Sequence, residues 1–215
     1  MTRLPDRAGL DGRWLRERFA QPRPWVPLST GDRPAGPDGE ALRPDELRPA
    51  AVLIAMIDRP GGFQILLTRR TAHLHDHAGQ ISFPGGREEP EDASPESTAL
   101  RETEEEIGLA PHRVEVLGRL NTYVTVTGYR VTPVVGVVQP PFELAPDDFE
   151  VAEIFELPLG VLLDRANHQR NTIVARGALR RYYAIPHDRH YIWGATAAML
   201  LNLYSFLTAE PALHA

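Results

Sequence analysis

The sequence contains no cysteine among its 215 residues. This absence excludes disulfide bonds, thiolate nucleophiles and cysteine-ligated zinc, and it fits a reducing cytoplasm. Positive charge is also scarce, because 23 Lys and Arg residues face 29 Asp and Glu residues, for a formal net charge of -6. A chain without a global basic field is not expected to bind nucleic-acid polymers. A phosphate-bearing ligand would therefore need local cations or a metal ion.

Long apolar runs are missing as well. The longest apolar stretch, Thr196 to Leu207, has 12 residues and contains Asn202 and Ser205, whereas a helix that spans a bilayer needs roughly 20. Charged residues such as Arg3 and Asp6 interrupt the apolar core that a signal peptide would require. We therefore expect a cytoplasmic protein without a membrane partner, in which residues 196–207 form a packed helix.

Composition and length indicate one main domain with extensions. Hydrophobic residues make up 42% of the chain and charged residues 24%, which is ordinary for a globular protein. Domains usually have roughly 100–200 residues. We expect an N-terminal helix over residues 10–20 within an arm rich in Pro and Gly (1–49), a main domain (50–208) and a short C-terminal tail (209–215).

The main domain mixes strands and helices. Its first two strands are predicted at Ala50–Ile57 and Phe63–Thr68, joined by a turn at Pro60-Gly61-Gly62. Ser94 and Pro95 are typical of a helix start and Gly108 of a helix end. Further strands are predicted at Val114–Leu120, Tyr123–Thr127, Val131–Val138, Glu150–Leu157, Tyr182–Ile185 and Tyr191–Ile192, and further helices at Leu159–Asp164 and Gly194–Leu207. This order fits an α/β sandwich or an α+β fold.

Three glutamates on the predicted helix after Ser94 are candidates for metal binding. Glu102, Glu105 and Glu106 are spaced i, i+3 and i+4, so they share one helix face. Carboxylates this close repel one another unless they are solvated, paired with cations or bound to metal. Oxygen-rich sites suit Mg²⁺ or Mn²⁺, which also engage phosphates. The glutamates alone favour a solvated acidic face, so the residues around them must decide between the two interpretations.

The residues around these glutamates resemble the Nudix box, G-x5-E-x7-R-E-U-x-E-E-x-G-U, in which U is a bulky aliphatic residue. The matching residues are Gly86, Arg101, Glu102, Glu105, Glu106, Gly108 and Leu109. The resemblance implies an α/β/α sandwich with a mixed β-sheet between helices. It also implies that Glu102, Glu105, Glu106 and the carbonyl of Gly86 bind Mg²⁺ or Mn²⁺, and that Arg101 orients a glutamate by an ion pair.

The chain departs from the box at two positions. It has one residue more than the pattern between Gly86 and Arg101, so the first box glutamate has no exact counterpart, and Asp92 is the nearest acidic residue. Thr103 stands where an aliphatic residue is usual, and its methyl group is expected to pack inward. The spacing of the metal-binding glutamates is intact.

A second resemblance is narrower. Leu66-Leu67-Thr68-Arg69-Arg70-Thr71, Gly79 and Phe83-Pro84-Gly85-Gly86 are similar to the signature L-L-T-x-R-S-x3-R-x3-G-x3-F-P-G-G of coenzyme A pyrophosphatases. Thr71 replaces a serine, and His75 replaces an arginine and so removes a permanent cation. The segment His190–Thr196 is also similar to the end of these enzymes, and Trp193 is equally a core or a ligand-contact candidate. The substrate-binding residues implied are Arg70, His75, Gly79, Phe83 and Gly85.

The roles of two further groups of side chains remain open. The general base is not part of the box, and Glu150 and Glu153 are the candidates, with Glu105 as an alternative. His73, His75 and His77 alternate along a predicted loop. Histidines on a loop are more often solvated or hydrogen-bonded than bound to a transition metal, so we do not expect a metal site there.

The resemblance implies metal-dependent hydrolysis of a diphosphate linkage. The leading substrate is coenzyme A or a derivative, cleaved to a 4′-phosphopantetheine species and adenosine 3′,5′-bisphosphate. Hydrolysis of ADP-ribose or another nucleoside diphosphate derivative is the alternative within the enzyme class, and a non-catalytic Nudix ligand-sensing domain is the alternative outside it. The expected partner is the small-molecule substrate, and a homodimer stays open.

Overall fold

The computed structural model describes residues 10–28, 42–73, 78–175 and 178–210. Its helices are α1 (Gly12–Ala20), α2 (Pro95–Ile107), α3 (Leu159–Leu163) and α4 (Gly194–Thr208), with short 3-10 turns at Pro44–Glu46, Pro111–Arg113 and Arg165–Asn167. Its strands are β1 (Arg48–Arg59), β2 (Gly62–Arg70), β3 (Ile81–Ser82), β4 (Gly85–Arg87), β5 (Val114–Arg119), β6 (Tyr123–Val124), β7 (Tyr129–Val138), β8 (Val151–Pro158), β9 (Gln169–Ala175), β10 (Ala178–His187) and β11 (His190–Trp193).

A mixed sheet forms the centre of the molecule. Its strands run in the order β3-β2-β1-β7-β5, while β4 also pairs with β1, β6 with β7 and β8 with β2. The central strands β1 and β7 are parallel, and all other pairs of this sheet are antiparallel. Residues Leu53–Ile57 of β1 are fully buried, which fits a strand covered on both faces.

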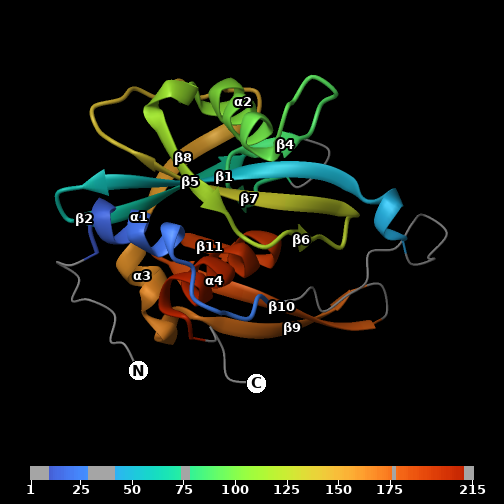
Figure 1. Cartoon of the computed structure of the whole chain (residues 1–215). Helices are drawn as coiled ribbons and strands as arrows, with labels where there is room; N and C mark the ends of the chain where they lie inside the picture. The colour runs from blue at the N-terminus through green and yellow to red at the C-terminus, as the bar shows by residue number, and fades with distance from the viewer. Residues whose placement is uncertain (1–9, 29–41, 74–77, 176–177, 211–215) are drawn as a thin grey trace.

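Helices cover both faces of the mixed sheet, so the predicted α/β/α sandwich is confirmed (Figure 1). On one face, Ala99 and Ile107 of α2 pack against Leu53 of β1 and its same-face neighbours. On the other face, Leu15 of α1 and the apolar residues of α4 join Met56 in a larger core. The predicted hairpin is confirmed as well, since β1 and β2 pair around Arg59 and Gly62.

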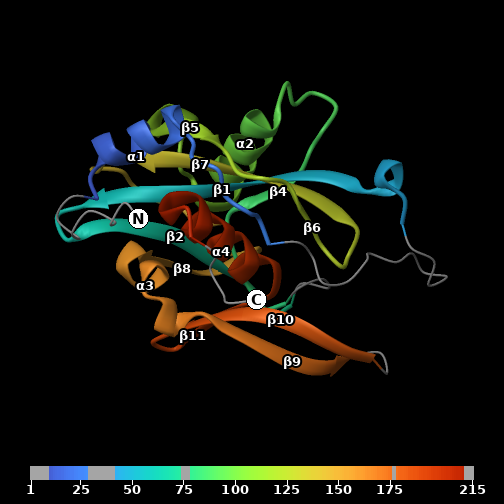
Figure 2. The ribbon, with the colours of Figure 1, turned by 60° about the horizontal axis from the view of Figure 1, so that its bottom comes forward.

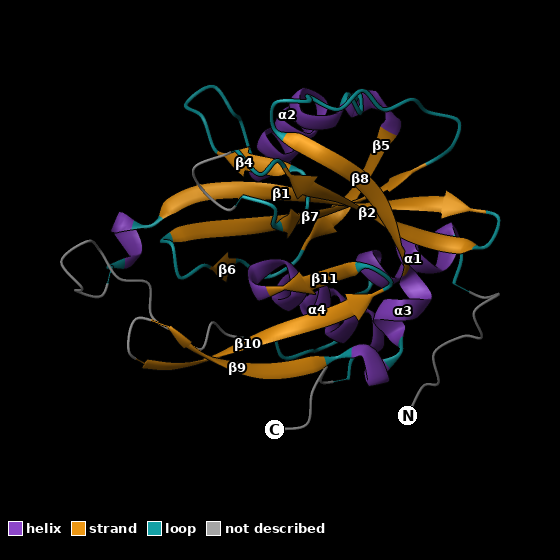
Figure 3. Cartoon of the chain, turned by 180° about the vertical axis from the view of Figure 1, so that it is seen from behind, coloured by secondary structure: helices purple, strands orange, loops and turns teal. Residues whose placement is uncertain are grey.

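A second, three-stranded sheet lies beyond α4. Its order is β11-β10-β9, and Figures 2 and 3 show α4 between it and the mixed sheet. Because α4 is enclosed in this way, all residues from Thr196 to Leu207 are buried, and the predicted packed helix is confirmed. No helix in the described part of the chain is long and apolar enough to cross a membrane.

The structure differs from the predicted elements at β6, and it contains the short strands β3 and β4, which were not predicted. The expected strand at Tyr123–Thr127 ends at Val124, because Gly128 and Tyr129 donate hydrogen bonds from their amides to Thr125 and close a turn. Strand β9 was not expected. It is an edge strand with a polar first half, and its side chains show too little burial contrast to produce an alternating pattern.

The N-terminal helix is attached to the same core as the main domain. Arg16 forms a bidentate ion pair with Glu115 of β5. Arg18 donates hydrogen bonds to the carbonyls of Phe206 and Leu207 at the end of α4 and stacks over the Phe206 ring. Helix α1 therefore packs as part of the sandwich.

Candidate active site

Helix α2 presents the three predicted metal-binding glutamates. It begins with a capping box, in which the Ser94 side chain accepts from the Ser97 amide and the Ser97 side chain accepts from the Ser94 amide. It ends at Gly108 in the left-handed conformation with φ 71°, as predicted. The buried arc with Ala99 and Ile107 faces the sheet, and Thr103 is also fully buried there. This packing fixes the rotation of the helix.

The carboxyl group of Glu102 lies directly against Gly86. A Cβ atom placed on Gly86 would stand 2.3 Å from a Glu102 carboxyl oxygen, so no larger residue fits there without displacing the carboxylate. Gly86 is held in β4, where it pairs with Ala51 of β1. The structure thus brings the predicted backbone ligand and the first predicted glutamate together.

Glu106 is a buried carboxyl group with only 7% of its surface exposed. Its Oε2 accepts a hydrogen bond of 3.2 Å from the amide of Gly85, and its Oε1 lies 3.5 Å from the guanidinium of Arg70. Burial raises the pKa of Glu106 to about 7; Gly85 and Arg70 oppose this rise, and the charges of Glu150 and Glu102 add to it. A nearby cation would favour the charged form.

Arg70 links Glu106 to Glu150, one of the two candidate bases. Its guanidinium lies 3.6 Å from a Glu150 carboxyl oxygen. Backbone contacts fix the segment that carries Glu150, since the amide of Thr71 donates to the Glu150 carbonyl at 2.9 Å and the Thr71 hydroxyl to the Phe149 carbonyl at 2.8 Å. Glu150 therefore belongs to the same cluster as the glutamates of α2.

Arg101 is held between the loop before α2 and the helix glutamates. It donates to both carboxyl oxygens of Asp92, at 3.1 and 2.9 Å, and to Glu102 and Glu105 at 3.1 Å each. The hydrogen bonds from Arg101 hold the pKa of Asp92 well below its ordinary value. Asp92 thus gives Arg101 an acidic partner in the lengthened loop.

We expect an Asp92→Ala variant to raise the half-saturating concentration of the activating metal by about tenfold, because groups that orient metal ligands typically contribute 10–100-fold. Without Asp92, Arg101 is free to turn and to reposition Glu102. The measurement is initial rate against metal concentration. The matched control is Glu91→Ala, an exposed acidic residue in the same loop. Equal metal dependence in both variants and the wild type would remove this role of Asp92.

The carboxylate cluster has the donor chemistry of a metal site for hard cations. The cluster offers only oxygen ligands. Burial raises the pKa values of Glu102 and Glu106, and the nearby charge of Glu150 adds to the rise in both. In the described residues no group of three His, Asp or Glu side chains already surrounds a common point. Instead, Glu102 and Glu105 are turned to Arg101 and Glu106 to Arg70.

Glu153, the other candidate base, is placed outside this cluster. It accepts hydrogen bonds from His190 at 3.1 Å and from Arg189, and its second oxygen lies 3.0 Å from Arg69. Arg69 and Arg70 are consecutive, but the register of β2 on β8 shifts between them. Arg69 pairs with Glu153, whereas Arg70 pairs with Glu106. The structure gives Glu153 no contact with the glutamates of α2.

The residues predicted to bind substrate are distributed over several environments. Arg70 and Gly85 lie in the carboxylate cluster. Gly79 lines a pocket of about 410 Å³ together with Arg69, Arg189 and Trp193. Phe83 is 2% exposed and belongs to the core, so its side chain is a packing residue. His75 and His77 lie outside the described residues, and the ring of His73 packs against Phe149 at 4.8 Å.

Sequence reasoning did not identify the group formed by Arg69, Arg189 and His190. These residues come from β2, the turn before β11, and β11 itself, and no spacing in the sequence relates them. The register of β2 on β8, which sets Arg69 opposite Glu153, would have revealed part of the group.

Comparison with known proteins identifies relatives. The sequence model of the NUDIX domain matches residues 47–176. The protein named Uncharacterized Nudix hydrolase NudL from Escherichia coli (strain K12) is 40% identical over 164 residues, which cover 76% of this chain and 85% of the relative. A NudL of Shigella boydii serotype 18 matches with the same identity and coverage.

Solved structures of Nudix proteins resemble this chain more distantly. RenU, a Nudix hydrolase from M. smegmatis, aligns with a TM-score of 0.47 and 22% identity over 60% of this chain and 80% of its own. An Ap4A hydrolase of C. elegans aligns with a TM-score of 0.45 and 19% identity over 52% of this chain and 80% of its own.

Proposed function

Because this chain belongs to the Nudix family of hydrolases, we propose that it cleaves the diphosphate linkage of coenzyme A or its acyl or oxidised derivatives. The products are a 4′-phosphopantetheine species and adenosine 3′,5′-bisphosphate. The observation that carries the chemistry is a cluster of carboxylates, in which Arg70 lies between Glu106 and Glu150 while Glu102 lies against Gly86 and is close enough to interact with the charges of the other two. The substrate assignment rests on the Leu66–Gly86 segment.

Nudix hydrolases generally use divalent metal ions, and we assign Mg²⁺ or Mn²⁺ to this one. Glu102, Glu105, Glu106 and the carbonyl of Gly86 would hold the ions, since carboxylate and carbonyl oxygens suit these hard cations. When bound, such an ion neutralises diphosphate charge and lowers the pKa of water.

The protein's own residues position the substrate and the attacking water. Arg70 offers a planar guanidinium to phosphate oxygens, and its 26% side-chain exposure leaves it accessible. Arg101 holds the carboxylates of Glu102 and Glu105 in position through one hydrogen bond to each. Glu150, with 41% of its side chain exposed, accepts a proton as the water oxygen bonds to phosphorus and the bridging P–O bond breaks. This base assignment replaces Glu153, which is engaged elsewhere.

Two other functions remain the alternatives. A Nudix hydrolase for ADP-ribose or another nucleoside diphosphate derivative would use the same carboxylates, and it is favoured only by the loss of arginine at His75. A ligand-sensing domain without catalysis has no need for the complete set of Arg101, Glu102, Glu105 and Glu106. Metal-dependent turnover separates the sensor from both enzymes.

We expect kcat/KM for coenzyme A to exceed that for ADP-ribose. Both substrates share an adenosine diphosphate half and differ beyond the second phosphate and at the 3′ position of the ribose, so discrimination must arise from contacts there. The measurement is initial rate for each substrate at the same concentration of magnesium. An ADP-ribose value equal to or above that of coenzyme A would overturn the substrate assignment and leave the family assignment standing.

A further inference from the structure

Besides the carboxylate cluster, a pocket at the end of β2 brings several charged and aromatic side chains together. It has a volume of about 410 Å³ and is lined by Arg69, by residues 78–81 and by the aromatic end of β11 with Arg189. Arg69 is the direct neighbour of Arg70, whose guanidinium lies in the carboxylate cluster. Consecutive Cα atoms are about 3.8 Å apart. The pocket and the candidate active site therefore share the end of one strand.

The pocket carries excess positive charge. Arg69, Arg189 and His190 all engage one carboxylate, that of Glu153. Burial disfavours the charge on Glu153, but His190 and Arg189 outweigh it and lower the pKa of this carboxyl group below its ordinary value. The described residues that line the pocket include no Asp or Glu. Two permanent cations thus face a single anion.

Both arginines are ion-paired with Glu153 but are exposed enough to contact a ligand as well, whereas Glu153 is largely buried. Glu153 is 14% exposed, whereas the side chains of Arg69 and Arg189 are 48% and 76% exposed. The ring of His190 stacks on Phe155 with centroids 3.7 Å apart and an angle of 6°. Glu153 and His190 are therefore mostly shielded from solvent, whereas the guanidinium groups of Arg69 and Arg189 are exposed to it.

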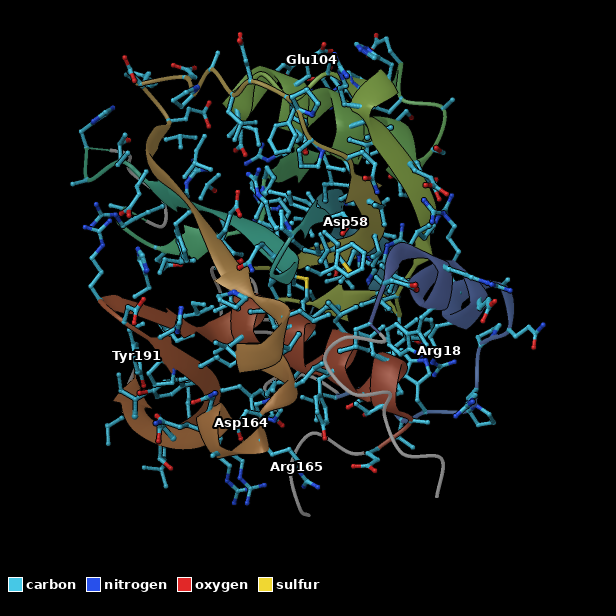
Figure 4. All side chains as sticks on the ribbon, turned by 90° about the vertical axis from the view of Figure 1, so that its left-hand side faces the viewer. Arg18, Asp58, Glu104, Asp164, Arg165 and Tyr191 are labelled. Carbon is cyan, nitrogen blue, oxygen red and sulfur yellow. The ribbon has the colours of Figure 1, made fainter. Side chains whose placement is uncertain are left out.

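Exposed aromatic rings border the cations. Trp193 and Tyr191 are 41% and 44% exposed. Trp193 packs edge-on against Tyr182 at 5.7 Å, and the Tyr191 hydroxyl accepts a hydrogen bond of 3.0 Å from Asn171. Figure 4 shows Tyr191 at the outer edge of the small sheet. Rings held in place with a free face can stack on a nucleobase.

We propose that this pocket binds the phosphorylated nucleoside end of the substrate, with Arg69 and Arg189 donating to a phosphomonoester that is separate from the scissile diphosphate. A guanidinium fork suits phosphate oxygens, and the aromatic border suits the base. The inference rests on the proposed function, because coenzyme A carries such a group on its ribose at the 3′ position and ADP-ribose does not. Arg69 and Arg189 are thereby specificity-determining residues.

The first test compares coenzyme A with 3′-dephospho-coenzyme A. In Arg189→Gln the ratio of their kcat/KM values should fall about tenfold, mainly through KM for coenzyme A, as expected for one lost charge-assisted hydrogen bond. Arg69→Gln should do the same. The control is Arg13→Gln on α1, whose side chain is exposed and pairs with Glu17; its ratio should equal that of the wild type. An unchanged ratio in both pocket variants overturns the proposal.

A binding measurement keeps this test independent of turnover. Isothermal titration with adenosine 3′,5′-bisphosphate, compared with adenosine 5′-monophosphate, should show tighter binding of the bisphosphate by the full chain, and Arg189→Gln should remove most of that difference. If the wild type cleaves neither coenzyme A nor its dephospho form, the proposed function fails. The titration then tests by itself whether the pocket binds the phosphorylated nucleoside. Equal binding of the two nucleotides by the wild type overturns the pocket assignment.

Discussion

Glu106→Gln is expected to lower magnesium-dependent turnover by at least about a hundredfold while the fold remains intact. Such a loss corresponds to about 2.7 kcal/mol of transition-state stabilisation, which is the size of effect seen when one preorganised electrostatic contact is removed. The glutamine has nearly the same shape, and its carbonyl oxygen can still accept the hydrogen bond that Gly85 donates to Glu106. The variant therefore removes a charge from the proposed metal site and preserves its packing.

The matched control is Glu104→Gln on the same helix. Glu104 lies on the outer surface of α2 (Figure 4), outside the arc of the proposed metal ligands, and this variant should keep nearly full activity. Steady-state kinetics at saturating magnesium, with circular dichroism as a check on folding, gives the comparison. Small and equal effects of the two substitutions would contradict the assigned roles of Glu106 and Glu104.

Removal of divalent metal should abolish turnover completely. Chelation with EDTA is expected to reduce the rate to background, and added Mg²⁺ or Mn²⁺ should restore it, because oxygen ligands and phosphate both favour these ions. Zinc should not be required, since the chain has no cysteine and the proposed ligands are all oxygen atoms, which suit Mg²⁺ and Mn²⁺. The measurement is the initial rate before and after re-addition of each ion.

Folding must be followed in the same experiment, because a metal can also stabilise the native state. The thermal midpoint of the stripped protein should stay high enough for the protein to be folded at the assay temperature. Full activity in a stripped sample would contradict the proposed mechanism. Loss of activity that re-added magnesium and manganese both fail to restore would contradict it equally.

Much of the fold was predictable because its main elements have strong local signals. Helix α2 carries a capping serine, a proline at its first turn and a terminal glycine, and its bounds were predicted to within a residue. Strands β1 and β7 were also predictable, because each contains a continuous apolar run that is buried on both faces. Strand β9 lacked such a signal, because its side chains lie at an exposed edge of the small sheet.

The candidate active-site carboxylates were predictable for a related reason. Glu102, Glu105 and Glu106 lie on one helix, so their relative placement follows from helical geometry. The role of Asp92 as a partner of Arg101 needed the structure, since the loop before α2 has one residue more than the family pattern. The group around Glu153 could not be found from the sequence, because it joins β2, β8 and β11, and only tertiary packing brings these strands together.

The central claim is that this chain hydrolyses the diphosphate linkage of coenzyme A with the help of a divalent metal. Mass spectrometry of the products formed from coenzyme A in ¹⁸O-labelled water with magnesium tests it most directly. We expect 4′-phosphopantetheine and adenosine 3′,5′-bisphosphate in equal amounts, with one labelled oxygen in one of the two products. Intact coenzyme A after prolonged incubation, or products cleaved at any other bond, would contradict the claim.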